Sequence, residues 1–231
     1  MKNKNLIALI FLIPLATMVT PLFCQPFETT LWFNQYRESF GLNSLTLDAL
    51  LENTAQAYAR EIAQSNRFSH KDLQKQRAQS RYFNKGGTHA LVGEILGIGP
   101  DADKIEKQWK ASEKHIAVIK DPRWTHFGQG FFFINRKLIY VLLFTKQWVA
   151  EINYGWNDKG DTWFLKGRWL LTNKPPILYN GIKVHSPSSW DQTSMMFSYK
   201  IKTDDLAAYL RLGYQDQGFQ VTNIFYPYKL R

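Results

Sequence analysis

A single cysteine, Cys24, constrains this chain of 231 residues, because it rules out any disulfide bond within the chain. Lys2 and Lys4 precede an apolar run over residues 6–16, which Pro14 interrupts. This layout is typical of a secretory signal peptide and is short for a membrane span. We therefore predict a leader over residues 1–24 and an exported protein, either extracellular, periplasmic or on the outer surface. Without bridges its stability has to come from a hydrophobic core.

Cys24 lies just past the apolar run, where a bacterial lipoprotein carries its lipid-modified cysteine. The preceding Pro21-Leu22-Phe23 fits this poorly, since a small residue usually stands before that cysteine, and simple cleavage nearby is the competing interpretation. We favour lipidation of Cys24 because it is the chain's one cysteine. An acyl group there would tether the protein to a membrane.

The formal net charge is +10, and +8 without the two lysines of the leader. A basic protein is attracted to phospholipid, to polyanionic cell-wall polymer or to nucleic acid, although the excess charge can also serve solubility alone. Residues 67–85 carry six basic residues against one acid, Asp72. We interpret this run as a solvated helix face rather than an anion-facing patch. Few aromatic residues interleave it, so we predict no nucleic-acid partner.

Three short stretches carry the candidate chemistry: Phe68-Ser69-His70-Lys71-Asp72, Gly93-Glu94 and Trp109-x-x-Ser112-x-x-His115. They supply two imidazoles and a carboxylate, the ligand types that a divalent cation such as zinc takes. Glu94 is the one acid of an apolar strand predicted over residues 89–98. Because a buried acid without a partner is costly, Glu94 should meet a histidine, a metal or backbone donors.

The remaining pattern predicts further elements. Helices are expected over residues 29–40 and 48–65, and a third runs from a cap at Asp101 to about Lys120, where Pro122 ends it. Its apolar face carries Trp109 and Ser112, with His115 at the rim. Strands 127–134 and 138–145 form a hairpin. After residue 150, several short strands with regular turns, among them Asn180-Gly181, predict a small β-sandwich or barrel without a recognisable site.

The ordered set of motifs over residues 31–146 resembles the CAP superfamily, the cysteine-rich secretory, antigen 5 and pathogenesis-related proteins, in its bacterial, disulfide-free (SCP-like) branch. The residues that carry this likeness are Asn34-x-x-Arg37, Leu45-x-x-Asp48-x-x-Leu51, Ala55, Ala59, Phe68-Ser69-His70-x-Asp72, Gly93-Glu94, Trp109-x-x-Ser112-x-x-His115, Gly128-x-Gly130 and Phe144. The resemblance implies an α+β fold: a three-layer α-β-α sandwich with a central antiparallel sheet over residues 28–148, followed by an all-β domain over residues 150–231.

The resemblance also implies a cleft where two histidines and one or two acids converge, and where some members bind a divalent cation. By motif position His70, Glu94 and His115 carry over as the candidate metal site. The second acid does not, since Ser112 stands where many members have glutamate. Ser112, Glu113 and His89 are then the expected neighbours of the cleft.

Several functions are compatible with such a cleft. In one, Glu94 acts as a metal ligand or as the base that takes a proton from metal-bound water; in another, the histidines only hold the cleft together. A serine nucleophile at Ser112 with His115 as base lacks a Gly-x-Ser-x-Gly context. Some CAP proteins bind lipids. We therefore predict a secreted or surface-tethered protein that binds a lipid, a small ligand or an extracellular partner without catalysis. The alternative is a zinc-dependent hydrolase acting outside the cytoplasm.

Overall fold

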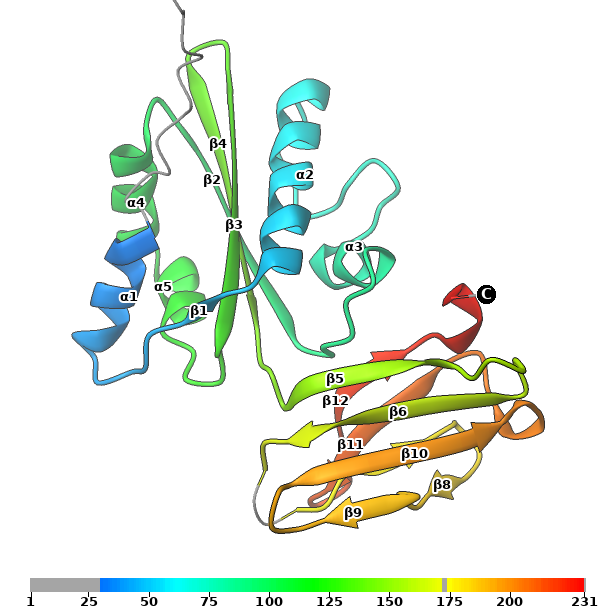
Figure 1. Ribbon diagram of the computed structural model, residues 1–231. Coiled ribbons are helices and arrows are strands. Elements are labelled where there is room, and N and C mark those ends of the chain that lie inside the picture. The colour runs from blue at the N-terminus through cyan, green and yellow to red at the C-terminus, as the bar shows by residue number, and fades with distance from the viewer. Residues whose placement is uncertain (1–29, 172–173, 231) are drawn as a thin grey trace, which may run out of the picture.

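The computed structural model describes residues 30–171 and 174–230 (Figure 1). We call residues 30–145 the N-terminal domain and residues 149–230 the C-terminal domain, because the last strand of the first sheet ends at Thr145 and the next strand begins at Val149. The predicted leader and Cys24 lie outside the described residues. Within these two ranges, every helix is too short or too polar to cross a membrane.

A four-stranded sheet forms the middle layer of the N-terminal domain, in the order β1-β3-β4-β2. β1 runs parallel to β3, and the other neighbours are antiparallel. Asn135 and Arg136 make the two-residue turn between β3 and β4, and both have positive φ, as a type I′ hairpin turn requires. The predicted hairpin is thereby confirmed. The strands are β1 (Thr46–Leu47), β2 (Val92–Gly99), β3 (His126–Ile134) and β4 (Lys137–Thr145).

Helices cover both faces of this sheet (Figure 1). One layer holds α1 (Thr30–Glu38), α4 (Ala102–Lys110) and α5 (Glu113–Ile119), and the other holds α2 (Ala49–Ser65) and α3 (Ala78–Asn84). Alternate residues of β4 pack into the two cores: Leu138 to Phe144 at even positions on the α1 side, Ile139 to Leu143 at odd positions on the α2 side. A strand buried on both faces reads as one apolar run. The predicted three-layer α-β-α sandwich is confirmed.

The helix predicted over residues 101–120 is instead two helices. α4 ends at Lys110, and Ser112 stands at the N-cap position of α5 with an extended backbone, φ −108° and ψ 112°. Serine prefers this position because inside a helix its hydroxyl competes for backbone hydrogen bonds. The expectation that Ser112 and His115 share one continuous helix face is therefore wrong.

The C-terminal domain is a sandwich of two four-stranded sheets, as predicted. The orders are β5-β6-β10-β9 and β12-β11-β7-β8, and side chains of both sheets, such as Trp163 and Leu212, meet in one core. Two short 3₁₀ helices, η1 (Thr203–Asp205) and η2 (Pro227–Leu230), accompany the strands. The strands are β5 (Val149–Trp156), β6 (Thr162–Trp169), β7 (Ile177–Tyr179), β8 (Val184–His185), β9 (Ser189–Asp191), β10 (Met196–Lys202), β11 (Leu210–Gln215) and β12 (Phe219–Phe225).

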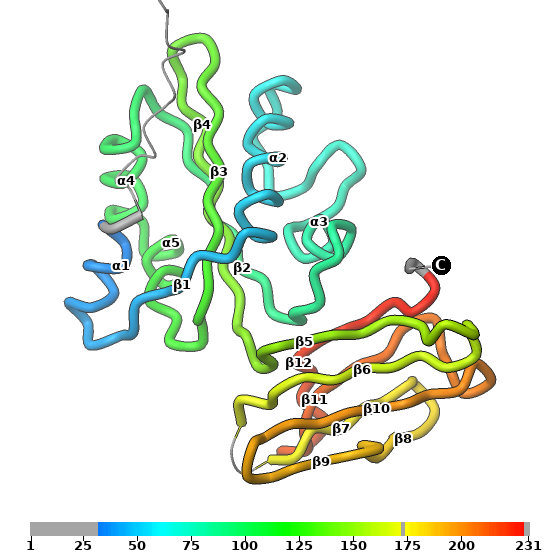
Figure 2. Tube along the Cα trace, viewed as in Figure 1, coloured from blue at the N-terminus to red at the C-terminus, as the bar shows by residue number. Residues whose placement is uncertain are grey.

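The two domains are joined by hydrogen bonds as well as by the chain. The segment between α3 and β2 runs beside β12, an edge strand of its sheet (Figure 2). The amide of Ala90 donates to the carbonyl of Thr222 (2.9 Å), and the amide of Ile224 donates to the carbonyl of Thr88 (2.7 Å). These bonds satisfy part of the backbone of β12, an edge strand that could otherwise pair with a strand of another chain.

Candidate functional site

Glu94 lies on β2, on the face of the sheet that α2 and α3 cover. Its neighbours two residues away, Val92 and Leu96, pack into the core of that side. The side chain of Glu94 is only 6% exposed. A carboxylate so placed needs compensating donors, and two side chains from outside the sheet supply them.

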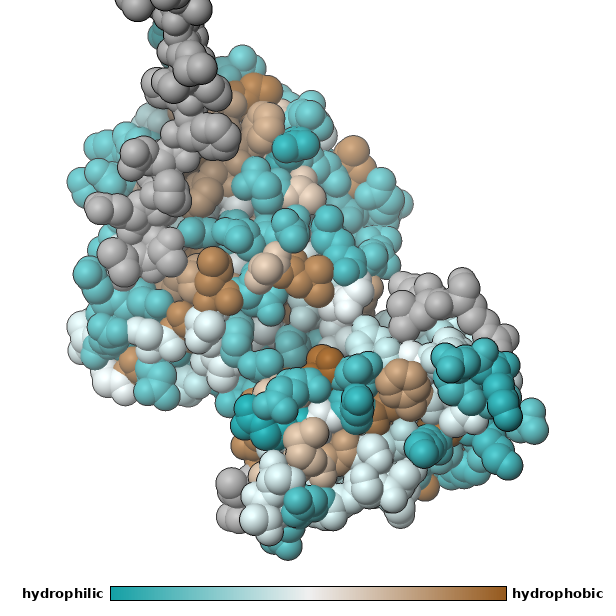
Figure 3. All heavy atoms as spheres, viewed as in Figure 1, coloured by the Kyte–Doolittle hydropathy of each residue, from teal (hydrophilic) through white to brown (hydrophobic). Residues whose placement is uncertain are grey.

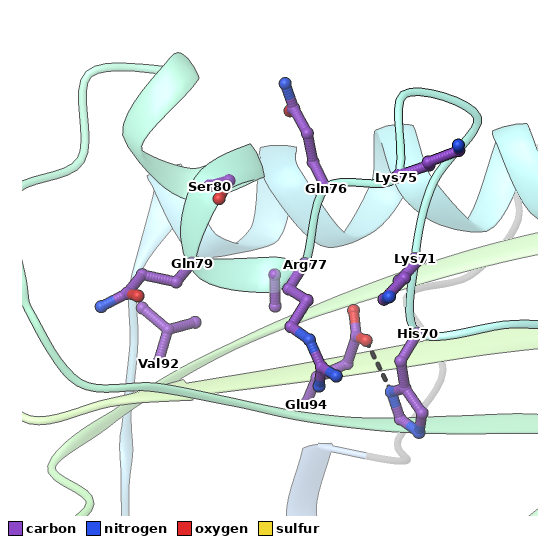
Figure 4. Close-up of a pocket in the computed structure, with 10 residues that line it drawn as sticks. His70, Lys71, Lys75, Gln76, Arg77, Gln79, Ser80, Val92 and Glu94 are labelled. Atoms are coloured by element: carbon purple, nitrogen blue, oxygen red, sulfur yellow. Dashed lines mark hydrogen bonds and ion pairs between the residues drawn. The ribbon is translucent and has the colours of Figure 1, made fainter.

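The first partner is His70, in the irregular segment that follows α2. Its Nδ1 lies 2.7 Å from Oε1 of Glu94, whereas the His70 side chain itself is 55% exposed (Figure 4). The hydroxyl of Tyr58 on α2 donates to the carbonyl of Ser69, and the hydroxyl of Ser69 accepts from the amide of Lys71 (3.0 Å). These bonds fix the turn that presents His70. Of the partners predicted for Glu94, a histidine, a metal or backbone donors, the structure has the histidine.

The second partner, Arg81 on α3, was not among the residues singled out from the sequence. Its guanidinium donates to Oε2 of Glu94 and lies over the ring of Tyr58, 3.5 Å from the ring centroid. Arg81 also donates to the carbonyl of Gln76 (2.9 Å). The Arg81 side chain is 8% exposed. The prediction that the basic run forms a solvated helix face is therefore wrong at this position.

A weak signal for Arg81 exists in the sequence. Ala78, Arg81 and Tyr82 stand at the i, i+3, i+4 spacing of a buried helix face, and all three are buried. Residues 67–77 precede α3 and form no helix of their own. The charge of residues 67–85 does not reveal this spacing. A basic residue is rarely buried unless it is paired, and the partner of Arg81, Glu94, lies outside this run.

His115 lies on α5, on the opposite side of the sheet from α3, and packs against Trp109. β2 is an edge strand of the sheet, so side chains from the helix layers on its two faces can meet beside it. Burial, and then the nearby His70 imidazole, lower the pKa of His115. Its Nδ1 is buried without a hydrogen-bond partner among the described residues.

The other expected neighbours are arranged differently. The exposed Glu113 lies in the first turn of α5, and the hydroxyl of Ser112 makes no capping bond there. In the described ranges Ser112 has no hydrogen bond to His115, as a serine–base pair would need. His89 was expected beside the cleft, but it packs against Tyr82 and its Nδ1 lies 3.2 Å from the amide of Asn223 in the C-terminal domain. His89 therefore belongs to the domain junction, where residues 88–90 pair with β12.

Glu94 is not placed as a direct ligand of a divalent cation in this arrangement. Both oxygens of Glu94 are engaged, one by His70 and one by Arg81, so the carboxylate has no free oxygen directed at a metal. The guanidinium also places a positive charge where a cation would bind. In the described ranges no three His, Cys, Asp or Glu side chains converge as a metal-binding group. The zinc site on His70, Glu94 and His115 therefore stays a prediction.

A cavity of about 710 Å³ opens beside this cluster (Figure 4). Glu94 is the one acid among the described residues that line it. Its other lining residues are His70, Lys71, Lys75, Gln76, Arg77, Ala78, Gln79, Ser80 and Val92. With Glu94 already neutralised by Arg81, three further cations give the cavity a positive lining.

Asp72 stabilises the loop that carries Lys71, Lys75 and Arg77. The buried Asp72 carboxylate accepts from the amide of Gln76 (2.7 Å), and its own amide donates to the carbonyl of Gln76 (3.0 Å). Glu61 on α2 accepts from the amide of Leu73 (2.9 Å). Two residues of the Phe68-Ser69-His70-Lys71-Asp72 motif thus have separate roles. His70 pairs with Glu94, and Asp72 stabilises the loop.

Comparison with known proteins agrees with this fold. Residues 32–144 match the model of the cysteine-rich secretory protein family, CAP. The uncharacterized protein YkwD of Bacillus subtilis is 27% identical over 99 residues, which are 42% of this chain and 38% of YkwD. The chain thus spans well under two thirds of that relative.

Solved structures also align with about half of the chain. An outer surface protein of Borrelia burgdorferi is 23% identical, with a TM-score of 0.49 over 51% of this chain and 89% of that one. An extracellular protein of Bacillus anthracis that contains an SCP domain is 21% identical, with a TM-score of 0.46 over 50% of this chain and 38% of that one. Taken with the family model, the α-β-α sandwich and the positions of His70, Glu94 and His115 place residues 32–144 in the CAP, or cysteine-rich secretory protein, family.

Proposed function

We propose that this protein acts outside the cytoplasm as a non-catalytic binding protein for an anionic ligand, which it takes in the cavity beside Glu94. The observation that carries the proposal is the charge of that cavity. Lys71, Lys75 and Arg77 line it, and its single acid, Glu94, is already paired with Arg81. The export-type leader supports this location, as does the likeness to an outer surface protein of Borrelia burgdorferi and an extracellular protein of Bacillus anthracis.

The chemistry of the lining suits a carboxylate or a phosphate. Ammonium and guanidinium groups donate charge-assisted hydrogen bonds to such anions, and the amides and hydroxyl of Gln76, Gln79 and Ser80 add neutral donors. A hydrocarbon chain would meet only Ala78 and Val92 as apolar partners. The cavity therefore favours a polar anion over the tail of a lipid.

The cationic loop is also preorganised. Three hydrogen bonds, two between Asp72 and Gln76 and one from Leu73 to Glu61, hold it in one shape. A ligand that binds a loop already in place loses less affinity to the ordering of that loop. The loop can therefore bind anions although its three cations are exposed.

The test is calorimetric titration of the chain without its leader, using polygalacturonate as a carboxylate polymer and polyphosphate as a phosphate polymer. Exposed ion pairs contribute up to about 1 kcal/mol each, so Lys71→Gln/Lys75→Gln/Arg77→Gln should weaken binding about tenfold to a hundredfold. The matched control Lys104→Gln/Lys107→Gln/Lys114→Gln removes the same charge from exposed positions on the opposite helix layer.

Two results support the proposal together. The loop variant loses affinity while the control does not, and raising the salt from about 0.1 M to about 1 M weakens binding, since the Debye length falls from ~10 to ~3 Å. Absence of binding to both polymers would refute it. So would an equal loss in both triple variants, because attraction would then follow net charge rather than this cavity. Hydrolysis of either polymer would contradict the non-catalytic assignment.

A further inference from the structure

A second basic cavity, of about 560 Å³, lies where the two domains meet. The N-terminal domain and the connector supply Gln79, Ala90, Leu91, Arg123 and Trp148, and strands β11 and β12 supply Arg211, Tyr214, Gln220, Val221 and Ile224. No acidic residue is present among the described residues that line it, but Arg123 forms an ion pair with Asp121 beside it (2.6 Å), so Arg211 is the lining cation without an acid partner in the described ranges. Figure 3 shows one face of the molecule, which is mostly hydrophilic with scattered hydrophobic residues.

Arg211 is the cation that the β domain contributes. Its guanidinium lies 4.8 Å from the ring centroid of Tyr179 and 5.6 Å from that of Tyr209, so two aromatic rings hold it in place. Its Nε is buried and donates no hydrogen bond within the described ranges, and no acid there pairs with it. A buried donor left unpaired is costly, and no acid in the described ranges compensates the positive charge that Arg211 brings to the cavity.

Two further features of this cavity restrict the chemical class of its ligand. Trp148 and Tyr214 offer large apolar surfaces, with the ammonium of Lys174 5.2 Å from the centroid of the Tyr214 ring. Gln79 and Gln220 offer amides that both donate and accept. Flat apolar faces, amides and arginines together match a chain of sugar rings that carry hydroxyls and carboxylates. A linear phosphate chain has no ring that could stack on these aromatic faces.

Gln79 lines both cavities, so they adjoin at this residue. Its side chain comes from α3 and donates to the carbonyl of Ala90, the residue whose amide pairs with β12. The junction bonds at Thr88 and Ala90 therefore hold the second cavity beside the first. One extended ligand can pass from the loop cations, over Gln79, to Arg211.

We infer that the ligand is a linear acidic polysaccharide and that the groove between the domains is its second subsite, with Arg211 as the charge donor. This inference rests on the proposed function, because the same chain must also occupy the first cavity. It assigns the C-terminal domain a direct role: lengthening the binding site by supplying one of its walls.

The experiment compares a galacturonate trimer with long polygalacturonate on the chain without its leader. Arg211→Gln should weaken the polymer several-fold and leave the trimer within twofold. Because Arg211 is half buried, Gln220→Ala, at an exposed position, is the companion variant and should weaken the polymer as well. The control Lys166→Gln/Lys200→Gln removes two exposed charges from the outer face of the other sheet.

The outcomes separate the two proposals. If the polymer binds and needs Lys71, Lys75 and Arg77 but neither Arg211 nor Gln220, the second subsite is refuted and the first stands. If the loop triple variant has no effect, the proposed function itself fails. Polyphosphate bound as tightly as polygalacturonate and weakened equally by the junction variants would refute the sugar assignment. Preference for phosphatidylglycerol vesicles over both polymers would do the same.

Discussion

Replacing Arg81 with alanine tests the charge arrangement of the site most directly. The change leaves the carboxylate of Glu94, 6% exposed, without its guanidinium partner. Removing one member of a buried ion pair typically costs 3–5 kcal/mol, and loss of the contact with the Tyr58 ring adds roughly 0.5–2 kcal/mol. Because His70 still contacts Glu94, we expect the lower end, about 3 kcal/mol.

The measurement has to resolve one domain from the other, since each has its own core and unfolding need not be two-state. Native-state hydrogen exchange of the β2 and β4 amides reports on the N-terminal domain alone. Arg77→Ala, on the exposed side of the same segment, is the control and should change stability by no more than about 0.5 kcal/mol.

A double-mutant cycle with Glu94→Gln isolates the pair. The coupling free energy between Arg81 and Glu94 should be at least about 2 kcal/mol, because their side chains are in contact and shielded from water. A coupling below about 0.5 kcal/mol would refute the reasoning. The cavity would then contain an available carboxylate, and the argument for anion binding would lose its main support.

Three further predictions concern residues around the same site. Burial lowers the pKa of His89 to about 4, from an unfolded value near 6.5, so the unfolded chain binds the proton first and stability should fall by about 3 kcal/mol as pH drops from about 6.5 to 4. Thermal unfolding across this range should show the loss, and a His89→Gln variant should lack it. Asp72→Ala removes a negative charge near the loop cations and yet should weaken anion binding several-fold, because the bond to Gln76 holds the loop. Stronger binding in calorimetry would show that charge alone matters. Zinc titration should give no saturable one-to-one binding; a signal that His70→Ala/His115→Ala abolishes would contradict the site described here and restore the hydrolase alternative.

Much of the N-terminal fold follows from the sequence because its signals are local. The apolar run of β4, the turn at Asn135-Arg136 and the caps at Asp48 and Asp101 are each readable within a few residues, and the structure has all of them. Both cap carboxylates accept from the backbone amide three residues on, at Leu51 and Lys104. Local hydrogen-bonding rules suffice for such features.

The site was only partly predictable because its main contacts are tertiary. That Glu94 requires a partner follows from its place in an apolar strand, and His70 was a candidate by motif. The identity of the second partner depends on which face of α3 turns inward, and this is settled by packing on Tyr58 rather than by charge. His89 is a similar case, since its partner Asn223 is 134 residues away in sequence. No local pattern encodes such a distant contact.

Under the proposed function, the position of Arg81 determines which class of ligand the cavity should accept. With Glu94 unpaired, the cleft would combine imidazoles with a free carboxylate, the donor set of a metal site. With Arg81 beneath it, that carboxylate is neutralised, and the charges that remain at the surface are those of Lys71, Lys75 and Arg77. The same buried pair anchors α3 to β2, and α3 carries Gln79 toward the domain junction. Loss of Arg81 should therefore weaken anion binding at both cavities as well as the fold, whereas loss of the loop cations should weaken binding alone.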